Sequence, residues 1–293
     1  MCGRYAVGRR SEELVELFDV DDPPPVPTAP DHNVAPGRAA PVVLERPGAD
    51  GRGPTRLLRP LIWGLVPSWA RSGPAGRRMI NARSESVLER PAFRGAVVRR
   101  RCLVPADGWY EWQREARTRG RGGRAGGRPY YIRPREGGPV ALAGLHEQWW
   151  GDGQRRGPEP APDGADGPLR TFAVLTTGSE ADLEPIHDRM PVVLPPGLWD
   201  AWLDPDLRDP HEILAMLRPA APGRFVAEPV STRVNSPSEN GPDLVLPVAD
   251  RHGDPRPAQA PGGGPEPGGT RDPRADTDTD TAGAGGDGTG TLF

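Results

Sequence analysis

The second residue of the chain, Cys2, has the most specific chemistry in the sequence. Because cysteine is small, we expect the initiator Met1 to be removed after translation. The chain would then begin with an α-amine of pKa about 7.7–8.0 and a thiol of pKa about 8.5 on adjacent carbons. Such an aminothiol condenses with an aldehyde to an imine, and the thiol then closes on the imine carbon to form a five-membered thiazolidine. The alternative is an incidental cysteine near the start of the chain.

Two titratable residues could move the protons that this condensation requires. Glu111 lies between Tyr110 and Trp112 on an expected strand, and an acid in such apolar surroundings has a raised pKa. The alternative for Glu111 is an outward-facing strand residue. His187 titrates near neutral pH and could open a sugar ring by protonating its oxygen. The alternative for His187 is a loop histidine bonded to the backbone.

Metal and cofactor chemistry is not expected from this sequence. The five histidines show no ligand spacing, and two cysteines cannot make a four-ligand zinc site. Cys102 lies in the apolar run Arg101–Pro105 and is expected to be an inert buried thiol. We therefore expect the chemistry of this protein to use side chains and the amino terminus without a metal.

Six short motifs occur in order along the chain: MCGRY at 1–5, NVAPG at 33–37, WGLVPSW at 63–69, NARSE at 81–85, ADGWYEW at 106–112 and IHDRMP at 186–191. This set closely resembles the SRAP family (SOS response-associated peptidase, the abasic-site-processing proteins), and the resemblance covers roughly residues 2–235. It implies that the protein binds single-stranded DNA with an abasic site. It also implies that Cys2 captures the ring-opened aldehyde as a thiazolidine DNA–protein crosslink, after autoproteolytic removal of Met1.

The resemblance also assigns roles to the residues near the expected reaction. Cys2 resembles the family's crosslinking nucleophile and Glu111 its acid/base glutamate. Asn81 resembles the asparagine that holds the abasic sugar and orients the cysteine, although asparagine before a helix is also a common turn residue. Together with His187, these residues form the expected catalytic set.

The residues expected to contact DNA are Arg4, Pro36, Trp69, Arg83 and Arg189. The three arginines resemble phosphate clamps, because guanidinium groups bind phosphate through two parallel hydrogen bonds. Each arginine taken singly could instead form a surface ion pair. Trp69 and Pro36, with the apolar turn Leu65–Val66–Pro67, are candidates for stacking on the bases beside the gap.

Other functions stay open on the sequence. An N-terminal-nucleophile cysteine peptidase or amidohydrolase would use Cys2, Glu111 and His187 on an amide. A nucleic-acid-binding module would use the arginines without covalent chemistry. Strand cleavage by a lyase reaction is also open, because a Schiff base acidifies the neighbouring C2′ proton and permits β-elimination.

The elements that must position these residues are mostly strands. Short apolar runs bounded by turn residues predict strands at 41–45, 56–66, 100–112, 129–133, 140–149, 171–177 and 224–231. Ser11 is the expected cap of one helix, Asp209–Pro210 starts a second, and a third follows Ser84. This pattern favours an α+β fold with a mainly antiparallel, barrel-like β-sheet and a few flanking helices.

Composition divides the chain of 293 residues into a folded body and a tail. Gly and Pro number 39 each, which is typical of chains with disordered segments. Residues 250–293 hold eight acidic residues, four arginines and few large apolar residues, so we expect a disordered acidic tail. The body, residues 2–249, is expected to be one SRAP-like abasic-site-processing domain with loop insertions near 45–55, 114–128 and 150–168.

Charge and targeting signals limit the partners and the location. Net charge is −3, and all 37 basic residues are arginine, a residue suited to phosphate recognition. The insertion at 114–128 has six arginines and one glutamate, which indicates either a solvated hairpin tip or a basic arm for nucleic acid. The start of the chain lacks a signal peptide, and the apolar stretch Leu61–Ala70 is too short to span a membrane. We expect a soluble, cytoplasmic monomer that acts at damaged DNA.

Overall fold

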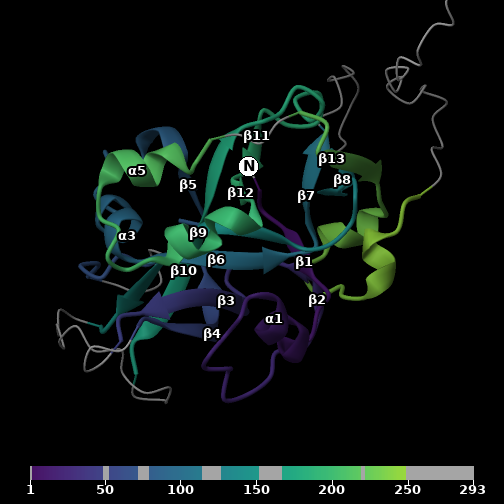
Figure 1. Ribbon diagram of the computed structural model, residues 1–293. Coiled ribbons are helices and arrows are strands. Elements are labelled where there is room, and N and C mark those ends of the chain that lie inside the picture. Colours follow the sequence, from purple (N-terminus) through teal and green to yellow (C-terminus); the bar gives the residue numbers. More distant parts are fainter. Residues whose placement is uncertain are drawn as a thin grey trace, which may run out of the picture. The chain divides into compact units, whose positions relative to one another are not determined.

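The computed structural model describes residues 2–48, 53–71, 79–113, 127–151, 167–218 and 222–248 (Figure 1). These residues belong to one compact unit, Met1–Arg251. The insertions expected near 114–128 and 150–168 and the expected tail at 250–293 lie wholly or mostly outside the described residues. The insertion expected near 45–55 lies partly outside them, and its two ends continue neighbouring strands.

The larger of two sheets closes into a ring. Its strands are β3 (Ala39–Arg46), β4 (Thr55–Trp63), β5 (Asn81–Arg83), β6 (Arg101–Ala106), β9 (Val140–Trp149), β10 (Leu169–Gly178), β11 (Arg189–Pro191) and β12 (Val193–Leu194). The order is β11-β10-β4-β3-β6-β9-β12, and a further pairing of β10 with β9 closes the ring. β10 pairs in parallel with β4 and β5, whereas the other pairs are antiparallel. The expected barrel-like, mainly antiparallel sheet is therefore confirmed.

The smaller sheet carries the start of the chain. Its strands are β1 (Tyr5–Val7), β2 (Asp31–Val34), β7 (Gly108–Gln113), β8 (Arg128–Pro134) and β13 (Phe225–Pro229). They pair antiparallel in the order β13-β8-β7-β1-β2, so β1 lies between β2 and β7 (Figure 1). The first residues of the chain are thus held beside the strand that contains Glu111.

The single strand predicted at 100–112 was wrong, because the chain passes from one sheet to the other at Asp107. Its first part is β6 in the ring, and its second part is β7 in the smaller sheet. The Asp107 carboxylate accepts hydrogen bonds from the backbone of Gly8 (2.6 Å) and the side chain of Arg9 (2.9 Å). At Gly108 a Cβ atom would lie 2.4 Å from the carbonyl oxygen of Ile132, so only glycine permits this close passage.

The helices are short and lie outside the sheets: α1 (Ser11–Leu17), α3 (Arg94–Arg99), α4 (Trp199–Leu203) and α5 (Pro210–Ala215). The helix expected at Asp209–Pro210 is confirmed as α5, with the Asp209 carboxylate accepting from the backbone of His211 at 2.7 Å. After Ser84 the chain first forms a 3-10 turn, Ser84–Ser86, and then α3. Among the described residues, no helix has the length and apolar character that a membrane span requires.

The expected cap of the first helix was wrong by one residue. Arg10 is the N-cap of α1, and the Glu13 side chain accepts a hydrogen bond from the Arg10 backbone at 3.2 Å. The Ser11 hydroxyl instead accepts from the backbone of Thr28 at 2.8 Å. Ser11 is therefore used to fasten the segment between α1 and β2 rather than to cap the helix.

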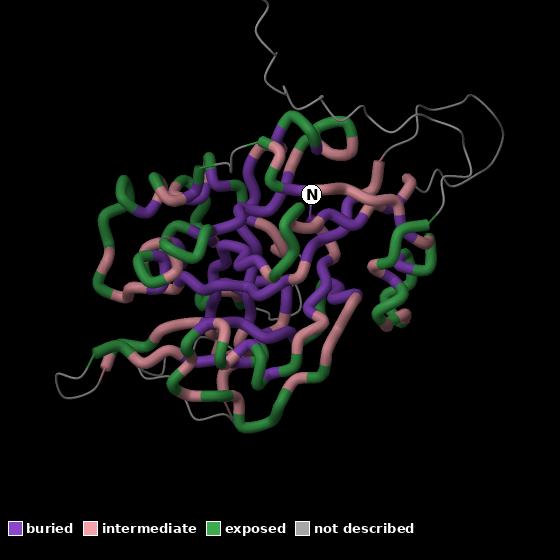
Figure 2. Tube along the Cα trace, turned by 45° about the vertical axis from the view of Figure 1, so that its right-hand side comes forward, coloured by how far each residue is buried: buried purple, intermediate pink, exposed green. Residues whose placement is uncertain are grey.

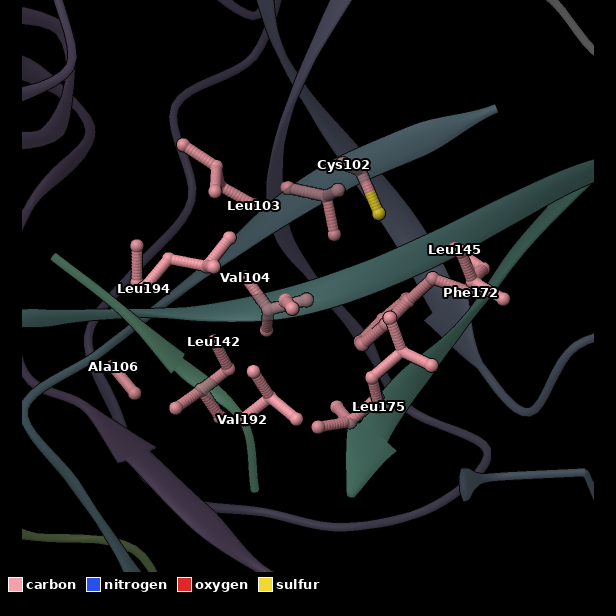
Figure 3. Close-up of a cluster of buried hydrophobic side chains, with 14 of the residues drawn as sticks. Cys102, Leu103, Val104, Ala106, Leu142, Leu145, Phe172, Leu175, Val192 and Leu194 are labelled. Carbon is pink, nitrogen blue, oxygen red and sulfur yellow. The ribbon is translucent and has the colours of Figure 1, made fainter. Parts of the chain in front are cut away.

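The interior of the ring is apolar. Side chains from β6, β9, β10 and β12 converge there, including Cys102, Val104, Leu142 and Phe172 (Figure 3). Cys102 is fully buried among them, as expected, and burial raises the pKa of its thiol. Figure 2 shows that buried segments run through the middle of the described chain, whereas most turns around them are exposed.

Candidate active site

Cys2 is fully buried, at the point where the chain enters β1. Its carbonyl oxygen accepts a hydrogen bond of 2.7 Å from the Nδ2 atom of Asn81, the first residue of β5. Because β5 belongs to the ring and β1 to the smaller sheet, this bond connects the two sheets at the start of the chain. The Oδ1 atom of Asn81 is buried and has no hydrogen-bond partner among the described residues.

Glu111 lies on β7, two residues beyond the position that pairs with β1. Its side chain points inward and the residue is 2% exposed, which excludes the outward-facing alternative. Burial raises the pKa of the Glu111 carboxyl to about 7. Burial also raises the pKa of the Cys2 thiol, and the nearby Glu111 carboxylate adds to that increase. The thiol and the acid therefore act on each other electrostatically.

His187 reaches the same place from the loop between β10 and β11. The loop is closed by a hydrogen bond from the Ser179 backbone to the Asp188 carbonyl oxygen (3.1 Å). The Nε2 atom of His187 lies 4.0 Å from an oxygen of Glu111. Its Nδ1 atom lies 3.0 Å from both the Asp188 carboxylate and the Arg189 backbone nitrogen. Neutral His187 accepts from Arg189 through Nδ1, whereas protonated His187 donates to Asp188.

The four residues of the expected catalytic set are thus brought together from the segment before β1, from two strands and from a loop: Cys2, Asn81, Glu111 and His187. This site has a thiol, an acid that titrates near neutral pH, an imidazole and an amide with a free acceptor. Such a set can move protons to and from the oxygen of a carbonyl group and the nucleophiles that add to its carbon beside Cys2. Among the described residues, no group of three or more His, Cys, Asp or Glu side chains is placed to hold a metal ion.

Arg4 is used within the protein itself. Its Nη1 atom donates to the Oδ1 atom of Asn33 (2.7 Å) and to the carbonyl oxygen of Val234 (2.8 Å). Its guanidinium also lies over the ring of Trp112, 5.9 Å from the ring centre. Asn33 is fully buried, and its amide nitrogen donates to the Ser236 and Glu239 carbonyl oxygens (2.9 Å each). Arg4 and Asn33 together fasten the 232–240 segment beside the site.

The other two arginines differ from each other. Arg83 is exposed on β5 and makes no side-chain hydrogen bond with any described residue. Arg189 is mostly buried on β11, and both of its Nη atoms donate to the Glu85 carboxylate, at 2.8 and 3.0 Å. The Arg83 guanidinium is therefore accessible to a phosphate, whereas both Nη atoms of Arg189 are already bonded to the Glu85 carboxylate.

The expected stacking residues lie outside the four-residue site. Pro36 is exposed in a turn closed by a hydrogen bond from the Arg38 backbone to the Ala35 carbonyl oxygen (3.1 Å). Gly37 completes the turn with a φ of 85°, a value that glycine adopts without strain. Trp69 is 60% exposed. Neither residue makes a hydrogen bond or ring contact with the four residues of the site.

The apolar turn proposed beside them was wrong as a stacking surface. Leu65 and Val66 are fully buried, and Pro67 is also buried. The Leu65 backbone donates to the Met79 carbonyl oxygen (3.1 Å), and the Val66 backbone donates to the Thr171 hydroxyl (2.9 Å). These contacts bury the 65–67 segment in the protein interior. Trp69, two residues further on, stays exposed.

Sequence reasoning missed two residues next to the site. Asn33 opens the NVAPG motif and anchors Arg4, whereas Glu85 closes the NARSE motif and holds Arg189. Both stand inside motifs that were recognised, so the signal was present. The partners lie 29 and 104 residues away along the chain, and only the folded structure joins them.

Comparisons with known proteins find relatives that match most of this chain. A protein 35% identical over 247 residues is the abasic site processing protein YoqW of Bacillus subtilis (strain 168), with 84% of this chain and 99% of YoqW covered. The abasic site processing protein HMCES of Gallus gallus is 31% identical over 244 residues, covering 75% of this chain and 66% of that protein.

The fold is also found among solved structures. A crystal structure of a protein from Bacteroides thetaiotaomicron matches with a TM-score of 0.67 and 22% identity, covering 85% of this chain and all of that one. A phage-related protein from Bordetella bronchiseptica is 29% identical with a TM-score of 0.55, covering 78% of this chain and 94% of that one. The family model of the SOS response associated peptidase (SRAP) matches residues 1–237, and the chain therefore belongs to the SRAP family.

Proposed function

We propose that this protein processes abasic sites in single-stranded DNA by forming a covalent thiazolidine crosslink through Cys2. The observation that carries the proposal is the grouping of Cys2, Asn81, Glu111 and His187 at the start of the chain. The relatives reported above are named for the processing of abasic sites, which supports this substrate class.

The proposed reaction begins with hydrolysis of the Met1–Cys2 bond by one water, which releases methionine and frees the Cys2 amine, because a peptide nitrogen is not a nucleophile. The freed Cys2 amine adds to the C1′ aldehyde of the ring-opened sugar. The hydroxyl group of the adduct then leaves as water, and a C=N bond forms. The Cys2 sulfur adds to the imine carbon while its proton passes to the nitrogen. The product is one thiazolidine ring, and one water is released.

Glu111 is suited to the proton transfers of this sequence. With a pKa of about 7, its carboxyl is present in both the protonated and the ionised form near neutral pH. The protonated form can donate to the departing hydroxyl, and the ionised form can accept the thiol proton. His187, 4.0 Å from Glu111, is placed to exchange a proton with it and with the sugar oxygen as the ring opens.

Asn81 is suited to holding both reactants. Its Nδ2 atom fixes the Cys2 carbonyl at 2.7 Å, and its buried Oδ1 atom can accept a hydrogen bond from a sugar hydroxyl. Holding reacting groups in position lowers the entropic part of the barrier. Trp69 and Pro36 offer exposed surfaces for stacking, and Arg83 offers a free guanidinium for the DNA backbone.

A peptidase that acts on foreign substrates through Cys2 is the weaker proposal. Attack on an amide requires a thiolate, and both burial and the Glu111 carboxylate disfavour ionisation of the Cys2 thiol. Closure of a thiazolidine is intramolecular and follows imine formation, so it can proceed from the neutral thiol. The peptidase activity that we propose is self-cleavage of the Met1–Cys2 bond. The lyase activity that we propose is strand cleavage by β-elimination from the imine.

The test uses the full chain and a single-stranded oligonucleotide with one abasic site. Intact mass should show loss of Met1, and exposure to the DNA should add the mass of the oligonucleotide less one water. A denaturing gel should show a covalent band that Cys2→Ala abolishes. Cys102→Ala, which removes the other buried thiol, should leave the band unchanged.

Three results would count against the proposal. A covalent band that persists in Cys2→Ala would assign the crosslink to another residue. Retention of Met1 on the crosslinked molecules would exclude the aminothiol reaction. Repeated turnover of an unrelated peptide by the wild type, with no crosslink to abasic DNA, would favour the peptidase.

A further inference from the structure

Glu85 and Arg189 form an ion pair at the edge of the candidate site that the proposed reaction does not use. The Nη1 atom of Arg189 donates to Oε1 of Glu85 at 2.8 Å, and Nη2 donates to Oε2 at 3.0 Å. Two parallel bonds of this kind are the same pattern by which a guanidinium binds a phosphate. The inference drawn from this pair rests on the proposed binding of DNA.

The two partners are held to different degrees. Arg189 is fixed by the fold, because its Nη2 atom also donates to the carbonyl oxygen (2.7 Å) and the hydroxyl (3.2 Å) of Thr176 on β10. Its side chain is 14% exposed, whereas that of Glu85 is 52% exposed on a short 3-10 turn. The arginine is therefore the fixed member of the pair, and the carboxylate is the member that can move into solvent.

The carboxylate of Glu85 also lies near two positively charged side chains, those of Arg189 and Arg83. The hydrogen bonds from Arg189 lower the pKa of Glu85, and the charge of the nearby Arg83 lowers it further. Both arginines thus favour an anion at this position. Arg83 is exposed and makes no side-chain hydrogen bond with the described residues, so this position has spare positive charge for a second anion.

We propose that Glu85 takes the place of a DNA phosphate on Arg189 in the free protein, and that the backbone of the bound strand displaces it. A phosphate would make with Arg189 the same two parallel hydrogen bonds that Glu85 gives up, so the exchange replaces one ion pair with another. Glu85 is then an affinity-determining residue, because it competes with phosphate for the same two N–H groups of Arg189.

The proposal predicts that removing the Glu85 charge strengthens DNA binding. Binding of a fluorescein-labelled, undamaged single-stranded oligonucleotide to the full chain is measured by anisotropy at several salt concentrations. Glu85→Gln should tighten the Kd by up to about fivefold at low salt, the upper limit given by the worth of an exposed ion pair. The gain should shrink as salt screens the charges.

Three further variants separate this effect from a general change in charge. Glu89→Gln removes an exposed acid four residues away whose side chain makes no hydrogen bond or ion pair with a described residue, so it measures the general effect. In an Arg189→Gln background, Glu85→Gln should give no more than that general effect. Glu85→Asp keeps the charge but shortens the side chain, and should tighten binding less than Glu85→Gln.

The outcomes distinguish this inference from the proposed function. Weaker binding by a folded Glu85→Gln variant would mean that the pair only positions Arg189, and would overturn the inference. Equal tightening with and without Arg189, or tightening no larger than that of Glu89→Gln, would also overturn it. If Glu85→Gln does not fold, Glu85→Asp decides the question by the same comparison. If the wild type neither binds nor crosslinks DNA, the result would instead contradict the proposed function.

Discussion

Cys2 and Cys102 are both fully buried, and burial raises the pKa of both thiols, but their surroundings differ in kind. Aliphatic side chains from four strands of the ring surround Cys102 (Figure 3). Cys2 lies where the two sheets meet, with an amide bonded to its carbonyl oxygen and an acid close enough to affect its ionisation. The thiol itself is therefore not what distinguishes the two positions.

In the proposed reaction, Cys2 differs from Cys102 through groups that burial alone does not supply. One is covalent, since loss of Met1 would give Cys2 a nitrogen nucleophile beside its sulfur. The other is tertiary, since Glu111, His187 and Asn81 come from separate elements. Cys102 has neither, although β6, which carries it, leads directly into β7, which carries Glu111.

The largest effect is expected from Glu111→Gln, which removes the acid that most distinguishes the surroundings of Cys2. The crosslinking rate should fall by about 10²–10⁴-fold, the usual contribution of general acid–base catalysis. Single-turnover crosslinking on gels measures the rate, and anisotropy with undamaged DNA should show nearly unchanged affinity. Glu147→Gln, at another buried acid on β9, should leave the rate intact. Equal loss of rate and affinity would make Glu111 a structural residue.

Asn81→Ala should have the next largest effect, because it removes the hydrogen bond that fixes the Cys2 carbonyl. A small misplacement of reacting groups can cost up to about a hundredfold, so we expect the crosslinking rate to fall by about ten- to a hundredfold. Asn240→Ala is the matched control, because Asn240 bonds the backbone of Pro30 and His32. A wild-type crosslinking rate in Asn81→Ala would show that Asn81 does not contribute to the reactivity of Cys2.

The pH dependence of stability should also separate the two regions. The pKa of Glu111 is raised from 4.5 to about 7 in the folded protein. Between these values the folded state keeps a proton that the unfolded state loses, so stability falls as pH rises, by up to about 3 kcal/mol. Denaturant titrations from pH 4.5 to 7.5 should show that the stability of the wild type falls relative to that of Glu111→Gln, whereas its difference from Cys102→Ala should not change with pH. His146, whose pKa burial lowers to about 3, adds the same opposite slope to every variant. Glu180, whose pKa burial also raises to about 7, should preserve part of the slope.

Gly144→Ala should disturb the surroundings of Cys102 and leave the candidate site alone. A Cβ atom at Gly144 would lie 2.8 Å from the Cys102 sulfur and 2.9 Å from Val104. We expect a loss of about 1–3 kcal/mol of stability from this overpacking, with the crosslinking rate unchanged below the melting temperature. Gly197→Ala, which meets no atom within 4 Å, should be nearly neutral in thermal melts. A large rate loss in Gly144→Ala would show that the two regions are coupled.

The local pattern of apolar and turn residues predicted most strands, but it did not predict how the strands connect the two sheets. Apolar runs located most strands within a few residues, and Asp209 with Pro210 correctly marked the start of α5. The run at 100–112 misled because most of its residues are apolar on both sides of Asp107, and apolar patterning does not show a change of sheet. The break depends on Asp107 meeting Gly8 and Arg9, which lie about 100 residues earlier.

The sequence by itself determined the chemistry of the first residues, the order of the motifs and the types of residue available for catalysis. Tertiary structure decided which of them meet. It placed Glu111 inward beside Cys2, committed Arg4 to Asn33 and covered Arg189 with Glu85, while Arg83 stayed exposed. The physical reason is that charge, burial and hydrogen bonding depend on neighbours in space, and here those neighbours are separated by up to about a hundred residues of chain.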